Sequence, residues 1–172
     1  NCMDVFFKEG NDNELFVLKQ GTTNVEFWKS TDGGNTFAAS LSGWPAITST
    51  AGRMTTTAAN ANRLYAVLLG STAPANIPHI VRSDDAGATW TLMCTGGTGL
   101  TGSTASPLGM SNGQGFYDLD ILANPNNANE VIAATTTAYR STDGGATFTA
   151  VGGYHGSFGI HPDIQEMIAI GG

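Results

Sequence analysis

The sequence has little positive charge and no long apolar run. Lys and Arg number 7 against 14 Asp and Glu, so the formal net charge of the 172-residue chain is −7. Nucleic acids and anionic membranes are bound by clustered positive charge, so the composition argues against both as partners. No run of about 18 apolar residues occurs, so we expect no membrane-spanning helix. The acidity suits a solvated surface, with a cationic partner or calcium as alternatives.

Cysteine is also scarce, and several catalytic patterns are missing. Cys2 and Cys94 allow one disulfide at most. The sequence has no zinc-type spacing of Cys and His, no P-loop and no Ser-His-Asp grouping. It begins without Met or a signal-peptide pattern, so we expect a mature or fragmentary chain. The low lysine content and the richness in Gly, Thr, Ser and Asn are typical of an extracellular or cell-surface bacterial protein.

One eight-residue pattern, Ser-x-Asp-x-Gly-x-Thr-aromatic, occurs three times, and we call it the box. The copies lie at 30–37, 83–90 and 141–148. Four short antiparallel strands with their loops need about 40 to 50 residues, so this spacing suits the blades of a β-propeller. No segment has a helical period. We therefore predict an all-β chain that forms a partial β-propeller, with three four-stranded antiparallel blades and part of a fourth.

Short apolar runs flank each box, so each blade can be written as strands A to D with the box at the C–D hairpin. The predicted units are 3–40, 53–94, 117–151 and, in part, 158–172. Strand A is expected to contain the matching pairs Asp4-Val5, Met54-Thr55 and Asp120-Ile121. We interpret 165–169 as a fourth strand B, which puts His161-Pro162 in an A-to-B turn. Since these units cannot close a ring, we expect the same or another chain to supply the remainder of the propeller.

The box residues suit a tight hairpin. Ser and Asp side chains accept backbone N–H groups in turns, Gly supplies a positive φ, and the aromatic ring can be buried against the sheet. Because the same set recurs in each blade, we interpret it as structural rather than catalytic. The set is Ser30, Asp32, Gly34, Thr36, Phe37, Ser83, Asp85, Gly87, Thr89, Trp90, Ser141, Asp143, Gly145, Thr147 and Phe148.

These boxes and their flanking strands resemble the BNR or Asp-box propellers, which include sialidases, xyloglucanase-type glycoside hydrolases and sortilin-type receptors. Residues 113–120, 124–127 and 139–145 are similar to secreted Bacteroidetes propellers that often carry a C-terminal sorting domain. Those proteins commonly continue with His-x-Asp-x-His, where this chain has 161–165 with Gln165 in the last place. The resemblance therefore extends only to His161 and Asp163, as turn residues or as part of a metal or ligand site.

The resemblance implies a secreted or cell-surface module that binds carbohydrate or protein. The alternative is a glycoside hydrolase, xyloglucanase-like or sialidase-like, with part of its catalytic apparatus outside this chain. A sialidase needs an arginine triad, but Arg82 and Arg140 both precede a box and are interpreted as structural. A xyloglucanase-type enzyme needs two carboxylates across a cleft, and Asp118, Asp120 or Asp163 could supply one. Whether the chain is an enzyme stays open.

Long loops are expected opposite the boxes, at 38–52, 70–78, 94–116 and 152–157, and binding is usually built on such loops. Candidates that could stack on a sugar or peptide, or simply pack, are Trp44, Tyr117, Tyr154 and His155.

No cofactor is firmly expected. Calcium could use the oxygen atoms of Asn11-Asp12-Asn13-Glu14 or Asp118-x-Asp120, although turn formation explains both stretches equally well. Cys2 precedes an inner strand and Cys94 follows an outer one, so we predict that they do not pair with each other.

Overall fold

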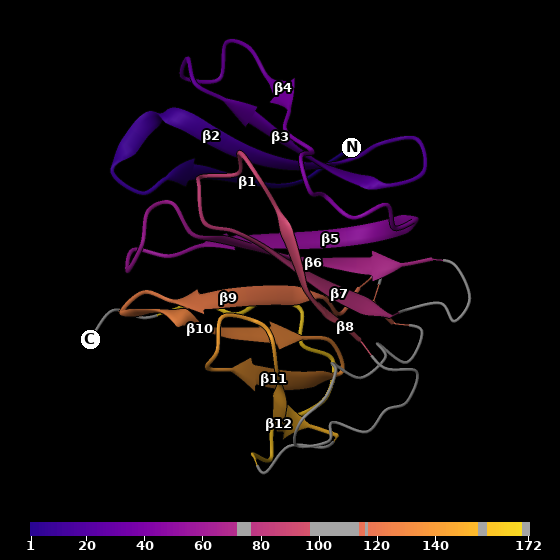
Figure 1. Cartoon of the computed structure of the whole chain (residues 1–172). Helices are drawn as coiled ribbons and strands as arrows, with labels where there is room; N and C mark the ends of the chain where they lie inside the picture. Colours follow the sequence, from indigo (N-terminus) through magenta and orange to yellow (C-terminus); the bar gives the residue numbers. More distant parts are fainter. Residues whose placement is uncertain (72–76, 97–113, 116, 155–157, 170–172) are drawn as a thin grey trace.

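The structure is a computed structural model that describes residues 1–71, 77–96, 114–115, 117–154 and 158–169. Within these ranges it holds twelve β-strands, in three four-stranded antiparallel sheets that lie one above the next (Figure 1). Each sheet is a meander, because its strand order follows the chain. The chain therefore forms three neighbouring blades of a β-propeller, as predicted.

The strand bounds give each blade an inner strand first and an outer strand last. Blade 1 holds β1 (Cys2–Lys8), β2 (Asn11–Gln20), β3 (Val25–Ser30) and β4 (Ala38–Ala39). Blade 2 holds β5 (Ser49–Thr56), β6 (Leu64–Gly70), β7 (Pro78–Ser83) and β8 (Thr91–Thr95). Blade 3 holds β9 (Asp120–Asn124), β10 (Asn127–Ala134), β11 (Thr137–Ser141) and β12 (Thr149–Gly153). The inner strands contact one another, β1 against β5 and β5 against β9.

The middle blade explains why the blades stack. All seven residues of β6 are buried, because this strand has a blade on each side. Its alternate residues divide between two cores, as the two-residue period of a strand requires. Leu64, Ala66 and Leu68 join the core shared with blade 1, and Tyr65, Val67 and Leu69 join the core shared with blade 3. Full burial of one such large apolar side chain contributes about 1.5–3 kcal/mol.

Each box is held by its own side chains. In blade 2 the Ser83 hydroxyl accepts the Gly87 N–H at 2.8 Å and donates to Asp85 Oδ1 at 2.8 Å. Asp85 in turn accepts the Thr89 N–H at 2.8 Å and the Thr89 hydroxyl at 2.6 Å. The boxes at 30–37 and 141–148 repeat all four contacts. In each blade these bonds satisfy the polar groups of the hairpin and fix its shape.

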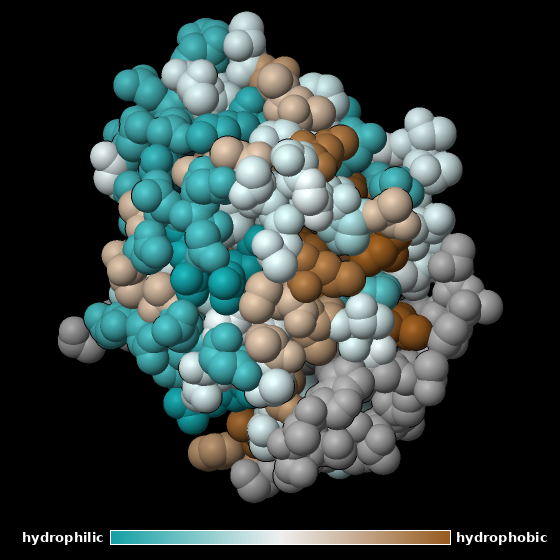
Figure 2. Space-filling view, in the orientation of Figure 1, coloured by the Kyte–Doolittle hydropathy of each residue, from teal (hydrophilic) through white to brown (hydrophobic). Residues whose placement is uncertain are grey.

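The boxes and the A-to-B turns lie on the same face. Gly33, Ala86 and Gly144 each donate a backbone N–H to the carbonyl oxygen of an Asn at the start of strand B, over 3.0, 2.9 and 2.8 Å. The side on which β9 turns into β10 is mostly hydrophilic (Figure 2). We call it the turn face, and we call the opposite side, from which the inner strands start, the loop face.

The box aromatics pack against the preceding blade. Trp90 is 4% exposed and meets Phe27 of blade 1 edge-on, with ring centroids 4.8 Å apart. Phe148 is 1% exposed and joins the core between blades 2 and 3. Phe37 is 40% exposed, so the prediction that all three rings are buried is wrong for this one. The reason is that no described blade precedes blade 1.

A cation precedes each box, and in blades 1 and 2 it also links its blade to the following one. Lys29 donates to the Ala86 carbonyl oxygen at 3.2 Å, and Arg82 donates to the Gly144 carbonyl oxygen at 3.1 Å. Both acceptors occupy the same box position in the following blade. Arg140 holds the third such position and instead pairs with Glu130 of its own blade, at 2.6 Å.

The register corrects the predicted match between inner strands. Asp4, Arg53 and Asp120 pair with Leu18, Val67 and Ala134, which stand at equivalent places in the second strands. Arg53, not Met54, therefore matches Asp4. The error arose because β5 lacks the alternation of polar and apolar residues that would reveal its register from sequence.

The fourth unit also differs from the prediction. The Met167 N–H donates to Asp120 Oδ2 at 2.5 Å, as the Met54 N–H donates to Asp4 Oδ2 at 2.7 Å. Segment 164–169 thus takes the place of an inner strand of blade 4, not of a strand B. His161-Pro162 accordingly precedes that segment rather than lying in an A-to-B turn. A short apolar run alone does not distinguish these two positions.

Two smaller predictions concern the cysteines and the membrane. Cys2 lies in β1 and Cys94 in β8, in different sheets, and no disulfide joins them. In the part of the chain that the structure describes, no helix is long and apolar enough to cross a membrane.

Candidate functional site

The inner strands of successive blades line a cavity of about 470 Å³, which we call the inner-strand pocket. Asp4 of β1, Arg53 of β5 and Asp120 of β9 stand in it at one register. Glu166 extends this row into the fourth unit, because it precedes Met167 as Arg53 precedes Met54. The fold thus brings four charges from segments far apart in the sequence into one row.

The carboxyl groups of this row are partly buried, and their environment changes their acidity. Burial raises the pKa of Asp4 to about 6, although the Met54 N–H and the positive charge of Arg53 oppose the rise. Burial also raises the pKa of Asp120, against the N–H groups of Ile121 and Met167 and the charge of Arg53. The two carboxyls therefore titrate closer to neutrality than ordinary aspartates.

Several flexible apolar side chains lie among these charges. Met3, Met54 and Met167 all line the pocket, and among the described lining residues Phe6 is the one aromatic. Methionine is unbranched and polarizable, so surfaces rich in it can adapt to ligands of different shape. The row of charges and these methionines form a site that can hold an apolar chain bearing a positive group.

The sequence analysis named only Asp120 of this row. Arg53 was missed because blade 2 was aligned one residue out of register, and Glu166 because its segment was interpreted as a strand B. Asp4 was aligned with Asp120 but not recognised as a site residue. The sequence does contain a signal for this row, which is the number of residues between each charge and the A-to-B turn of its blade. Counting back from the second strand of each blade gives the same position for all three described inner strands.

The other predicted catalytic residues lie near the loop face. Asp118 has no solvent exposure, and its carboxyl lies within hydrogen-bonding reach of Asp163. Burial raises the pKa of Asp118, and the negative charge of Asp163 raises it further. Asp163 also pairs with His161 over 3.7 Å, at a position where the His161 side chain is 86% exposed. Asp118 and Asp163 thus form a close pair, whereas Asp120 belongs to the inner-strand pocket.

The predicted stacking residues have different environments. Trp44 donates its indole N–H to the Val25 carbonyl oxygen at 2.9 Å, and its ring meets Trp90 edge-on at 4.7 Å. It therefore packs between blades 1 and 2. Tyr117 and Tyr154 are 57% and 56% exposed and carry their rings at the surface. His155 and most of loop 94–116 lie outside the described residues.

In the first expected calcium site, two of the four side chains have oxygen atoms that are engaged by the protein. Asn11 accepts the Asn13 N–H at 3.1 Å, and Glu14 accepts from Lys8 at 3.1 Å and Lys29 at 2.6 Å. Across the described ranges, no group of three or more His, Cys, Asp or Glu side chains lies together.

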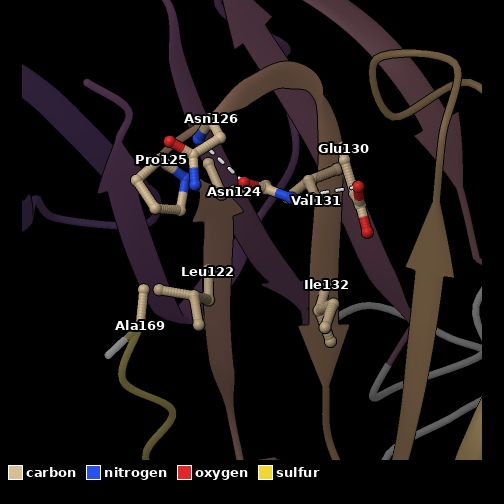
Figure 3. A pocket seen from close by; sticks show the side chains of 9 residues that line it. Leu122, Asn124, Pro125, Asn126, Glu130, Val131, Ile132 and Ala169 are labelled. Carbon is tan, nitrogen blue, oxygen red and sulfur yellow. Dashed lines mark hydrogen bonds between the residues drawn. The ribbon is translucent and has the colours of Figure 1, made fainter. Parts of the chain in front are cut away.

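A second cavity, of about 250 Å³, lies on the face of blade 3 that points away from blade 2. Leu122 of β9 and Ile132 of β10 line it, and Leu122 points toward Ala169 of the fourth unit (Figure 3). Their counterparts in blade 1, Phe6 and Phe16, belong to or pack against the core shared with blade 2. This cavity is therefore an incompletely covered interface between blades.

Comparisons with known proteins identify the fold of the chain through solved structures only. No protein-family model matches the chain, and no curated protein matches it. Among solved structures, a GH74 enzyme from Niastella koreensis is 23% identical with a TM-score of 0.60, over 91% of this chain and 23% of that chain. YCF48 bound to a D1 peptide is 15% identical with a TM-score of 0.58, over 90% of this chain and 40% of that chain.

A third structure, the GH74 xyloglucanase from Xanthomonas campestris, is 13% identical with a TM-score of 0.52. It is matched over 80% of this chain and 20% of that chain. The chain thus spans 20% to 40% of the length of these three proteins. At such identities the similarity establishes a β-propeller and not an activity.

Proposed function

We propose that this chain is part of a secreted or cell-surface Asp-box propeller that binds a protein segment in the inner-strand pocket. The observation that carries this proposal is the combination of the charged row with three methionines in one cavity. Three carboxyl groups oppose the single guanidinium of Arg53, so the pocket favours a basic side chain. The methionines accommodate the apolar residues beside that basic side chain.

Two further observations support a peptide over a sugar. One propeller of the same fold was solved as YCF48 bound to a D1 peptide. Binding sites for sugars usually offer aromatic rings for stacking, and Phe6 is the one ring among the described residues that line the pocket. The exposed Tyr117 and Tyr154 lie outside that lining.

The test compares two labelled peptides by fluorescence anisotropy, one with Lys and Arg between leucines and a twin with Glu in their places. We expect the basic peptide alone to bind. Asp4→Asn and Asp120→Asn should each weaken binding about tenfold, equivalent to ~1.4 kcal/mol. Asparagine keeps an oxygen that can accept the Met54 or Met167 N–H, so these variants remove charge with little effect on the blade contact. Exposed Asp12→Asn is the matched control, and equal binding by all four proteins would contradict the proposal.

A second candidate function is glycoside hydrolysis, which one observation favours. Asp4 has a pKa of about 6 and shares the pocket with Asp120, whose charge acts on it. A raised pKa suits a general acid, and a second carboxylate suits the partner role in glycosidases. Hydrolysis of xyloglucan that disappears in Asp4→Asn would establish this function. Peptide binding without turnover would favour the first.

We also propose that further blades of the same kind complete the ring. Apolar side chains that are not fully buried at both ends of the three-blade stack support this, Val17, Trp28 and Phe37 at one end and Ile132 and Val151 at the other. A secreted location is supported by composition alone, and detection in the culture medium or on the cell surface would test it.

A further inference from the structure

Two carboxyl groups lie close together at the loop face, between blade 3 and the fourth unit. Asp118 stands two residues before β9, and Thr135 directly follows β10. The Ile164 N–H donates to the Thr135 carbonyl oxygen at 3.1 Å, which brings Asp163 beside that turn. The carboxyl groups of Asp118 and Asp163 lie within hydrogen-bonding reach of each other. Three segments distant in sequence thus converge on one cluster.

Most oxygen atoms of this cluster lack a donor. Asp118 is 0% exposed and Thr135 is 3% exposed. Among the described residues, no hydrogen-bond donor reaches either carboxyl oxygen of Asp118, and Thr135 Oγ1 has no partner. Asp163 faces Asp118 with a second carboxyl group and so adds negative charge. Buried carboxylates without donors are strongly destabilising unless a proton or a cation neutralises them.

We propose that Asp118 and Asp163 bind a hard divalent cation, and that calcium is the ion this site takes. Every donor atom is oxygen, and calcium accepts about six to eight oxygen ligands in irregular geometry. Two carboxylates balance its double charge. The Asp163 side chain is 34% exposed, so water can complete the coordination from that side.

The cation has a structural consequence for the propeller. Asp118 precedes the inner strand of blade 3, and Asp163 precedes the inner segment of the fourth unit. A bound ion ties these two inner segments together at the loop face. It also lets Asp118 stay ionised at neutral pH, because a nearby positive charge favours the carboxylate.

The experiment measures thermal unfolding of the whole chain at neutral pH, in calcium and in chelator. Calcium should raise Tm, because a ligand of the folded state stabilises it. Terbium, a luminescent substitute for calcium, should show emission excited through the neighbouring Tyr117. Asp118→Asn and Asp163→Asn should both lose the Tm shift. Terbium affinity should fall by at least about tenfold, since even the loss of a residue that only orients a metal ligand costs 10–100-fold.

Asp163→Asn keeps the experiment informative if Asp118→Asn does not fold. Asp163 is partly exposed and has a φ of 81°, and asparagine tolerates that conformation as well as aspartate. Asp12→Asn, in the acidic turn 11–14, is the matched control and should keep the full calcium response. The proposal is overturned if the wild-type chain does not respond to either ion. It is also overturned if both Asp118→Asn and Asp163→Asn keep the response, or if Asp12→Asn abolishes it.

Discussion

The box glycine occurs three times in one conformation but in three environments, and this offers a sharp test of blade packing. Gly34, Gly87 and Gly145 have φ values of 87°, 79° and 90°. A Cβ on Gly87 would lie 2.5 Å from Cζ of Phe27 in the preceding blade. On Gly145 the nearest atom would be Ile80 Cγ2 at 3.2 Å, and on Gly34 it would be Leu15 Cδ2 at 3.7 Å.

The expected costs follow from these distances. Gly34→Ala should lower the free energy of unfolding by about 1–2 kcal/mol, the cost of a left-handed backbone for a residue with a Cβ. Gly87→Ala adds the overpacking of a closed core, about 1–3 kcal/mol more. Phe27 is fully buried and touches Trp90, so its ring has little room to move. Gly145→Ala should fall between the two, because its contact requires a shift of only a few tenths of an ångström.

Urea unfolding of the three variants measures these differences directly. The double variant Gly87→Ala/Phe27→Leu should recover about 1–2 kcal/mol relative to the sum of the single changes, since a smaller side chain relieves the contact. Equal costs at Gly34 and Gly87 would refute the packing of blade 1 on the box of blade 2. So would strict additivity in the double variant.

Two further predictions concern charges. The folded-state pKa of Asp4, about 6, lies above the ordinary aspartate value of 3.8, so the folded chain binds more protons than the unfolded chain between these pH values. The stabilising effect of the Asp4 proton is therefore present below about pH 4 and lost as pH rises through about 6. Asp4→Asn should reduce this slope in urea unfolding between those pH values, and an unchanged slope would contradict the burial of Asp4. Arg82→Ala should cost about 1–2 kcal/mol by breaking a blade-to-blade bond, whereas Arg140→Ala should cost about 0–1 kcal/mol by removing an exposed pair. Equal unfolding free energies for these two variants would argue against the role of Arg82 between blades.

The fold was predictable from sequence because its signal is local and repeated. Each box carries its own donors and acceptors within eight residues, so its geometry needs no partner from elsewhere. The all-β class, the blade number and the hairpin positions follow from that pattern and its spacing. The burial of Phe37 was mispredicted because burial depends on a neighbouring blade, which a local motif does not encode.

The candidate site was less predictable, because it arises between blades. Its members stand one per blade at a single register, and an alignment error of one residue hides the row. The pairing of Asp118 with Asp163 was equally hidden. That pairing depends on segment 164–169 lying beside β9. The apolar run of this segment resembles a strand B equally well, so the sequence does not reveal its place.

Charges that serve the repeat are paired wherever it recurs. Glu14 pairs with Lys29 in blade 1, and Glu130 pairs with Arg140 in blade 3. In blade 2 the position equivalent to Glu14 and Glu130 holds Arg63 instead, and the negative charge of Asp84 compensates for this added positive charge. The ion pairs of this compensating group are Arg63–Asp84 and Arg82–Asp84. A departure from the repeat is thus neutralised within the same blade.

The inner row does not follow this rule, and that contrast is the strongest argument that it serves a ligand. Among the described residues no carboxylate lies within 4.0 Å of the Arg53 guanidinium, although it stands between Asp4 and Asp120. The row keeps an excess of negative charge despite partial burial, which raises the pKa of both aspartates. Asp4 and Asp120 each accept one backbone N–H group from the next inner segment, but that bond does not require a net charge. Charges held unpaired in a cavity lined with methionine instead suit a partner that brings the missing positive charge.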